Sequence, residues 1–146
     1  MYRLALVDHT DPDIADDIAD LDRAVFNDGS PNLDPETIAV GRRVWWLAFH
    51  SGEPVGYCAL DFGETPGFGY MARAGVLVNH RGNRLQPRMI RARERKARLL
   101  GLTNMVTDTA YFNVRSSNNL IRAGYQLYKP EKPWSFDTSL YWKKKL

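Results

Sequence analysis

The apolar residues of the first third of the chain change from strand spacing to helix spacing. Tyr2 to Val7 alternates weakly and predicts a first strand. The acidic segment Asp11 to Asp13 then predicts the start of a helix, because apolar residues follow it at helical intervals. Turn-forming residues at Asn27 to Pro31 predict its end. A short second helix is predicted over Asp34 to Val40.

A β-hairpin is the predicted structure of the next part of the chain. Its strands are expected at Val44–Phe49 and Pro54–Phe62, joined by a turn at His50–Glu53. A glycine-rich loop is expected at Gly63–Gly69. The following stretch, Tyr70–Val78, is apolar enough to predict a central strand.

The second half of the chain contains the clearest helical pattern. It predicts a helix over Leu85–Leu100, ended by Gly101. A strand, a helix closed by Gly124 and two final strands are expected after it: Asn104–Phe112, Val114 or Arg115 to Ala123, Tyr125–Tyr128 and Ser135–Trp142. The predicted order is therefore β-α-α-β-β-β-α-β-α-β-β.

Composition favours one globular domain over residues 1–146. The chain is 44% hydrophobic and has no apolar run of the ~20 residues that a membrane helix needs. Residues 1–8 are too short and too quickly acidic for a signal peptide. A single cysteine, Cys58, leaves no internal disulfide, and three scattered histidines give no metal spacing. We therefore expect a metal-free protein of the reducing cytoplasm.

Charge is distributed unevenly, although the net charge is only +3. Residues 8–36 are acidic, residues 81–98 are strongly basic, and the chain ends with Lys143-Lys144-Lys145 before the last residue. This pattern indicates an anionic ligand near the middle of the chain and favours a cationic one near its start.

The segment Val76–Gln86 is predicted to run from a strand through a glycine-containing turn into a helix. Such a turn leaves several backbone N–H groups unpaired and pointing outward, and the helix dipole adds partial positive charge. It is an anion site, and phosphate is the usual anion. A second segment, Asn113–Tyr125, combines polar residues, a helix start and a closing glycine.

Together with the element order, these segments resemble those of the GNAT-type N-acetyltransferases over nearly the whole chain. The family's signature is Arg/Gln-x-x-Gly-x-Gly/Ala, usually with a valine five residues before it. Val76 and Arg81 match it, and Gly82 matches the Arg-Gly beginning that is common in the family. Arg84 and Gln86 stand where the signature has small residues. If Arg84 has a negative φ, this departure costs little.

The second segment matches the family's Asn-x-x-Ser/Ala…Gly-Phe/Tyr pattern at Asn113, Ser116 and the Gly124-Tyr125 pair. The resemblance implies an α/β fold, with a mixed, mostly antiparallel, twisted sheet of about seven strands flanked by about four helices. It also implies a transferase that moves acetyl directly from acetyl-coenzyme A to a primary amine, without a metal.

The resemblance further assigns the parts of coenzyme A to this chain. Backbone amides from Arg81 to Gln86 would hold the pyrophosphate, Val76 to Val78 would pair with pantetheine, and Asn113 would bind the pantetheine side. The implied coenzyme A-binding residues are Val76, Leu77, Val78, Arg81, Gly82, Asn83, Arg84, Leu85, Gln86, Asn113 and Ser116.

Arginines gather on one arc of the predicted helix from Leu85, at about 100° per residue. Three interpretations stay open: a solvated face, a contact of Arg88 with the 3′-phosphate of coenzyme A, and a nucleic-acid surface. No aromatic residues interleave with the arginines, which argues against single-strand stacking. Arg93 and Lys96 fall on the apolar side with Leu99 and Leu100, and are expected to snorkel.

The acid and base of the reaction are harder to place. Asp108, in the middle of a predicted strand, is the first choice for a base, with Asp61 and Glu64 behind it. Many family members have a tyrosine acid four residues before the glycine of the second segment, where this chain has Leu120. Leucine cannot donate a proton.

Two alternatives to a working amine acetyltransferase follow from these departures. Leu120 and the altered turn are consistent with a catalytically silent coenzyme A-binding module. The arginine arc is consistent with an enzyme that acetylates an RNA-borne amine. The acceptor itself is not specified, and an unpaired final strand or exposed tryptophans could support a homodimer.

Overall fold

A computed structural model of the chain describes residues 1–27 and 31–146. The predicted turn at Asn27–Pro31 therefore lies partly outside the described residues. The chain divides into two compact units, residues 1–61 with 72–89 and residues 62–71 with 90–146. Each unit is described by itself below.

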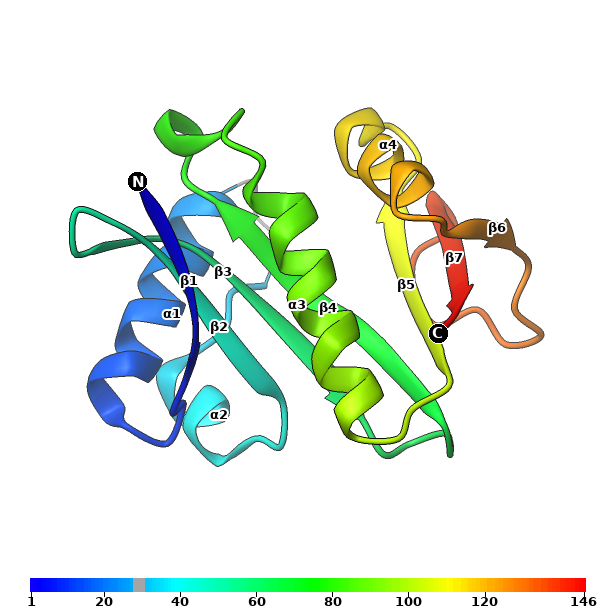
Figure 1. Cartoon of the computed structure of the whole chain (residues 1–146), viewed down its shortest axis with the longest axis horizontal. Coiled ribbons are helices and arrows are strands. Elements are labelled where there is room, and N and C mark those ends of the chain that lie inside the picture. Colours follow the sequence, from blue (N-terminus) through cyan, green and yellow to red (C-terminus); the bar gives the residue numbers. More distant parts are fainter. Residues whose placement is uncertain (28–30) are drawn as a thin grey trace. The chain divides into compact units, whose positions relative to one another are not determined.

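The first unit contains the antiparallel strands β1 (Tyr2–Val7), β2 (Val44–His50) and β3 (Glu53–Phe62), the helices α1 and α2, and parts of β4 and α3 (Figure 1). In β1–β2 pairing, Tyr2 lies opposite His50. In each helix an aspartate caps the N-terminus: Asp11 accepts from the amide of Asp13, and Asp34 from that of Thr37. The elements are β1 (Tyr2–Val7), α1 (Pro12–Val25), α2 (Pro35–Val40), β2 (Val44–His50), β3 (Glu53–Phe62), the end of β4 (Phe68–Val76), the short 3-10 helix η1 (Val78–His80) and the start of α3 (Leu85–Leu99).

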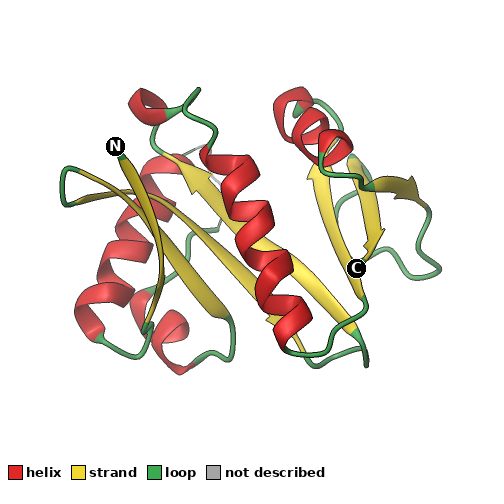
Figure 2. Ribbon diagram, in the orientation of Figure 1, coloured by secondary structure: helices red, strands yellow, loops and turns green. Residues whose placement is uncertain are grey.

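The second unit contains the start of β4, most of α3 and the C-terminal elements (Figure 2). β4 pairs with β5 in parallel, with Tyr70 opposite Val106. β7 is antiparallel to both β5 and β6. The C-terminal elements are β5 (Asn104–Ala110), α4 (Val114–Arg122), β6 (Gln126–Tyr128) and β7 (Ser139–Lys145).

The predicted fold class and element order are confirmed. The seven strands follow the order β1-β2-β3-β4-β5-β7-β6. The pairs β1–β2, β2–β3, β5–β7 and β6–β7 are antiparallel, and β4 pairs with β5 in parallel. The sequence pattern did not predict the 3-10 helix η1. The prediction of a single domain over residues 1–146 stays a prediction.

Several predicted strands have wrong boundaries, β4 and the last strand most clearly. β4 ends at Val76. The amide of Leu77 makes the last hydrogen bond to β3, at the carbonyl of Val55, and the amide of His80 then bonds to the carbonyl of Leu77 and forms a turn. Val78 lies in η1 and is exposed. The last strand begins at Ser139 instead of Ser135, and it continues through the lysines because their backbone pairs with β5.

Helix α3 also departs from its predicted faces. Leu99 is 79% exposed although it was predicted on the apolar side. Arg93 is 3% exposed, so its side chain is buried and does not snorkel. Glu94 is buried beside it and accepts a hydrogen bond from Tyr125 Oη at 2.8 Å, while Lys144 Nζ lies 3.1 Å from its Oε2. Burial and the bond to Glu94 raise the pKa of Tyr125, so this phenol stays protonated.

The core of the first unit is built around a fully buried carboxylate, that of Asp22 on α1. It accepts hydrogen bonds from Tyr57 Oη at 2.5 Å, from Arg73 Nε at 2.8 Å and from the amide of Leu33 at 2.9 Å. Burial alone would raise the pKa of Asp22, but these bonds and the charge of Arg73 outweigh it and lower the pKa. The arrangement joins α1 to β3, β4 and the segment before α2.

Asp22→Asn should lower the free energy of unfolding by about 3 kcal/mol, because it leaves the Arg73 cation without its buried anion. A carboxyl whose pKa is lowered in the folded state stabilises the fold above its unfolded pKa of about 3.9, and this stability is lost as pH falls through the folded value. The difference in the free energy of unfolding between wild type and Asp22→Asn, measured by urea unfolding, should therefore decrease below about pH 4. If the difference in the free energy of unfolding did not change with pH, Asp22 would not be ionised in the folded protein.

Candidate functional site

The turn between β4 and α3 has an alternating backbone conformation. Gly82 has φ +81° and Arg84 has φ +61°, whereas Asn83 between them has a negative φ. When left-handed and right-handed residues alternate, successive N–H groups can point toward one anion, an arrangement called a nest. The φ values of residues 82–84 are those expected of such a turn. The expectation that Arg84 costs little if its φ is negative does not apply, since a side chain in this region costs about 1 kcal/mol or more.

Five successive amides of this turn, those of Gly82 to Gln86, donate no hydrogen bond to any residue that the structure describes. The amide of Arg81 was predicted to belong to this group, but it bonds weakly to the carbonyl of Val78 at 3.4 Å. The guanidinium of Arg81 also turns back, and its Nε donates to the carbonyl of Val76 at 3.2 Å. The nest therefore consists of the amides of residues 82–86.

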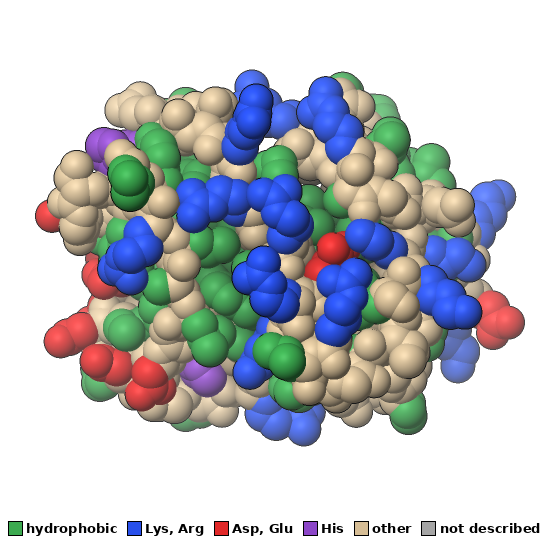
Figure 3. Space-filling view, viewed as in Figure 1, with side chains coloured by type: hydrophobic (Ala, Val, Ile, Leu, Met, Phe, Trp, Pro, Cys, Tyr) green, Lys and Arg blue, Asp and Glu red, His purple; other side chains and the backbone are tan. Residues whose placement is uncertain are grey.

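Positive side chains gather over α3 (Figure 3). Arg81 and Arg84 are exposed, as are Arg91, Arg95 and Arg98 along the helix. Arg88 is different, because its Nη1 donates to the carbonyl of Tyr2 at 3.1 Å. This bond occupies part of the guanidinium that one of the three open interpretations placed against a 3′-phosphate.

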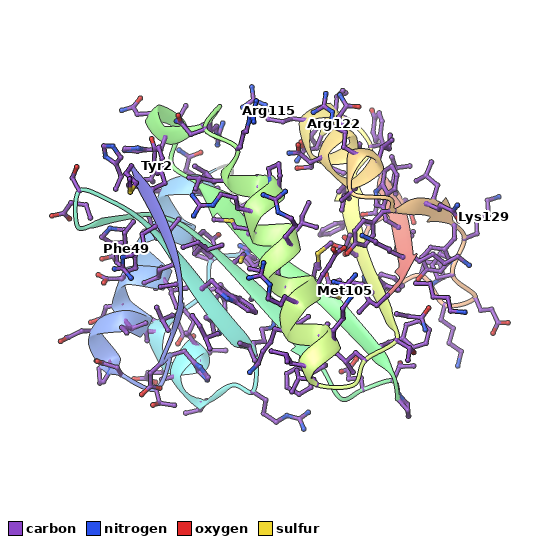
Figure 4. The ribbon with its side chains drawn as sticks, viewed as in Figure 1. Tyr2, Phe49, Met105, Arg115, Arg122 and Lys129 are labelled. Carbon is purple, nitrogen blue, oxygen red and sulfur yellow. The ribbon has the colours of Figure 1, made fainter. Side chains whose placement is uncertain are left out.

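The second segment forms the N-terminus of α4. Asn113 is the N-cap residue, and its Oδ1 accepts from the amide of Ser116 at 3.2 Å. Both predicted residues of this segment therefore lie together at one helix end. Arg115 and Arg122, labelled in Figure 4, are exposed on the same helix. Leu120 is buried.

Asp108 lies on β5 among aromatic side chains. The sequence analysis did not predict that these residues come together. Its Oδ1 accepts hydrogen bonds from Tyr70 Oη at 2.8 Å and from Trp134 Nε1 at 3.0 Å. The ring of Trp134 meets those of Tyr70 and Tyr141 edge to face, with centroids 6.1 and 4.6 Å away. The carboxylate is half-buried, and within the described ranges its Oδ2 accepts no hydrogen bond.

The two second-choice bases have simpler surroundings. Asp61 forms an ion pair with Arg43 at 3.2 Å, and Glu64 is exposed in the loop before β4. Asp108 is oriented by two aromatic donors, the hydroxyl of Tyr70 and the ring N–H of Trp134. A carboxylate fixed by two donors, with its second oxygen open, suits contact with an ammonium group or proton transfer.

Comparison with known proteins places the chain in a family. The model of the acetyltransferase (GNAT) family matches residues 12–125. The chain belongs to the acetyltransferase (GNAT) family. The predicted family is thereby confirmed, and with it acyltransferase chemistry as the family's general activity. No curated protein matches the sequence.

Solved structures support the same fold of this GNAT protein. A Klebsiella pneumoniae protein provisionally named acyl-CoA N-acyltransferase has 28% identity and a TM-score of 0.75, and the match covers 100% of this chain and 98% of that one. The ribosomal-protein-S18-alanine N-acetyltransferase of Escherichia coli has 7% identity and a TM-score of 0.77, with 99% and 94% covered. A Bacillus subtilis acetyltransferase in complex with CoA has 12% identity and a TM-score of 0.74, with 100% and 99% covered.

Membrane insertion through a helix is not supported by the elements of this GNAT protein. Within residues 1–27 and 31–146, none of the helices combines the length and the apolar character needed to cross a bilayer.

Arg84→Gly should raise the free energy of unfolding by about 0.5 kcal/mol, because relief of the left-handed strain exceeds the added entropy of the unfolded chain. Urea unfolding would measure it. The matched control is Arg91→Gly in the interior of α3, where glycine should cost about 1 kcal/mol. If both variants lost the same free energy of unfolding, the backbone at Arg84 would not be strained.

Proposed function

We propose that this GNAT protein is an N-acetyltransferase that moves the acetyl group of acetyl-coenzyme A directly onto a primary amine. The observation that supports it best is the nest of five backbone amides at residues 82–86. A diphosphate needs several N–H donors at once, and the N-terminus of α3 adds favourable dipole charge. The complex of the Bacillus subtilis relative with CoA is consistent with such a ligand.

In this proposal the pyrophosphate lies on the amides of Gly82 to Gln86, with Arg84 beside them. Val76 to Val78 face pantetheine through the backbone groups that the fold leaves available. The carbonyl of Val76 and the amide of Leu77 already have partners. Oδ1 of Asn113 accepts the capping hydrogen bond of α4, so Nδ2 of Asn113 is the group that would donate to pantetheine.

Gly82→Ala should weaken binding of coenzyme A by about tenfold in calorimetry, because a Cβ at φ +81° distorts the nest. The matched control is Gly101→Ala, which places a Cβ at φ +78° at the end of α3, also in open space. Both variants should lose similar stability, but only Gly82→Ala should lose affinity. If wild type at high concentration shows no binding of coenzyme A, the proposed function is wrong.

Asp108 is the proposed base of the reaction. When the amine attacks the thioester carbonyl, a C–N bond forms, the C–S bond breaks, and the ammonium must lose a proton. Oδ2 of Asp108 is open to accept it, directly or through a water, while Tyr70 and Trp134 hold the other oxygen. The aromatic rings around this carboxylate also favour a cationic acceptor.

The departing thiolate has no tyrosine in the family's usual place, because Leu120 occupies it. Tyr125, the nearest phenol in that segment, keeps its proton on a bond to Glu94. We therefore assign protonation of the thiolate to water, which is sufficient because a thiolate is a tolerable leaving group.

Asp108→Asn should lower kcat by about 100-fold or more, with an unchanged affinity for coenzyme A, since it removes a base and leaves the nest intact. Release of coenzyme A with a panel of primary amines would measure it. Asp137→Asn, which neutralises an exposed carboxylate in the loop before β7, is the control and should keep full activity. A similar loss in both variants would exclude Asp108 as the base.

The rival functions are distinguished by the same assay. A silent coenzyme A-binding module, favoured by Leu120, would bind coenzyme A and release none from acetyl-coenzyme A with any amine. An enzyme for RNA-borne amines would need the exposed Arg91, Arg95 and Arg98 to bind RNA with a marked dependence on salt. We place the protein in the cytoplasm. The homodimer stays an expectation, based on an unpaired final strand or exposed tryptophans.

A further inference from the structure

We propose that Tyr2, at the start of β1, is a positioning residue for the amide nest of residues 82–86. Its hydroxyl would hold the strained turn in the conformation that presents the amides to a phosphate. The proposal rests on the proposed function of this turn in binding coenzyme A. It concerns a residue outside both motifs.

The hydroxyl of Tyr2 is the centre of a small hydrogen-bond network (Tyr2 is labelled in Figure 4). It lies 3.0 Å from Nδ1 of His80 and accepts from Nδ2 of Asn83 at 3.1 Å. The same Nδ2 lies 3.1 Å from the carbonyl of His80. One hydroxyl therefore bonds the residue that ends η1 and the middle residue of the turn.

Tyr2 is itself held firmly. Its ring contacts those of His50 and His80, with centroids 4.7 and 5.8 Å away. Its backbone pairs with His50 in the sheet, and its carbonyl accepts from Arg88 of α3. The hydroxyl is thus presented from a rigid element, as positioning of a site requires.

The conformation of Arg84 explains why such support is needed. A left-handed non-glycine residue persists only where its surroundings over-determine it. Glycine at this position, as in the family's signature, would adopt the conformation without cost. Asn83 lies between the two left-handed residues, so a bond to its side chain fixes the segment whose φ signs alternate. The Tyr2 hydroxyl would thus compensate for the missing glycine.

A double-mutant cycle with wild type, Tyr2→Phe, Arg84→Gly and the double variant tests this coupling. Phenylalanine keeps the ring contacts and removes only the hydroxyl. Calorimetry should show coenzyme A binding weakened by about 3- to 10-fold by Tyr2→Phe, the size expected for one lost hydrogen bond. In the Arg84→Gly background the same change should have less than about a twofold effect. In turnover, the loss should be in KM for acetyl-coenzyme A and not in kcat.

The control is Tyr128→Phe on β6, whose hydroxyl makes no hydrogen bond to any described residue and which should bind coenzyme A normally. Amide NMR of the unliganded proteins gives a second readout: Tyr2→Phe should shift the resonances of residues 82–86, and Arg84→Gly should restore them. Equal weakening in both backgrounds, or unshifted resonances, would overturn the proposal. Shifted and restored resonances without any binding of coenzyme A would instead retain this role of Tyr2 and reject the proposed function.

Discussion

The rest of the proposed site depends on five backbone amides, those of Gly82 to Gln86, which donate no hydrogen bond within the described chain. In the proposal these amides point together at one phosphate group. Ordering these residues costs conformational entropy, and the left-handed Arg84 adds strain. The end of β4, the return of the Arg81 guanidinium to Val76 and the start of α3 offset this cost. A site of this kind is prepared by its own fold, before any ligand is present.

Each unit also contains a buried carboxylate with a complete set of partners. Asp22 in the first unit has Arg73 and Tyr57, and Glu94 in the second has Lys144 and Tyr125. Neither carboxylate is in position to act as a free base, because hydrogen bonds or ion pairs already occupy them. Their role is to fix neighbouring elements: Asp22 joins α1 to β4, and Glu94 joins α3 to β7. This separates the structural carboxylates from Asp108, whose second oxygen is open.

The proposed chemistry takes account of two residues, Arg84 and Leu120, at which this chain departs from the family pattern. Arg84 removes a glycine from the turn, and Leu120 removes a tyrosine from α4. For the first loss, the compensation we propose comes from the hydrogen bonds that the Tyr2 hydroxyl of β1 makes with His80 and Asn83. The second is not compensated by Tyr125, because that phenol is committed to Glu94. A reaction that tolerates an unassisted thiolate is therefore consistent with the residues present.

The sequence determined the element order and the location of the turn, because hydrophobic periodicity, caps and glycines act over short distances. The family followed from the resemblance of two sequence segments to the GNAT motifs, which the family match over residues 12–125 confirms. The capping aspartates, Gly101 and the segment Asn113–Ser116 were all predicted from such local signals. Tertiary structure decided the rest. The left-handed φ of Arg84, the network of Tyr2 with His80 and Asn83, the donors on Asp108 and the burial of Glu94 all depend on residues distant in sequence. The lysines of β7 form a strand for the same reason, since pairing with β5 outweighs their local preference.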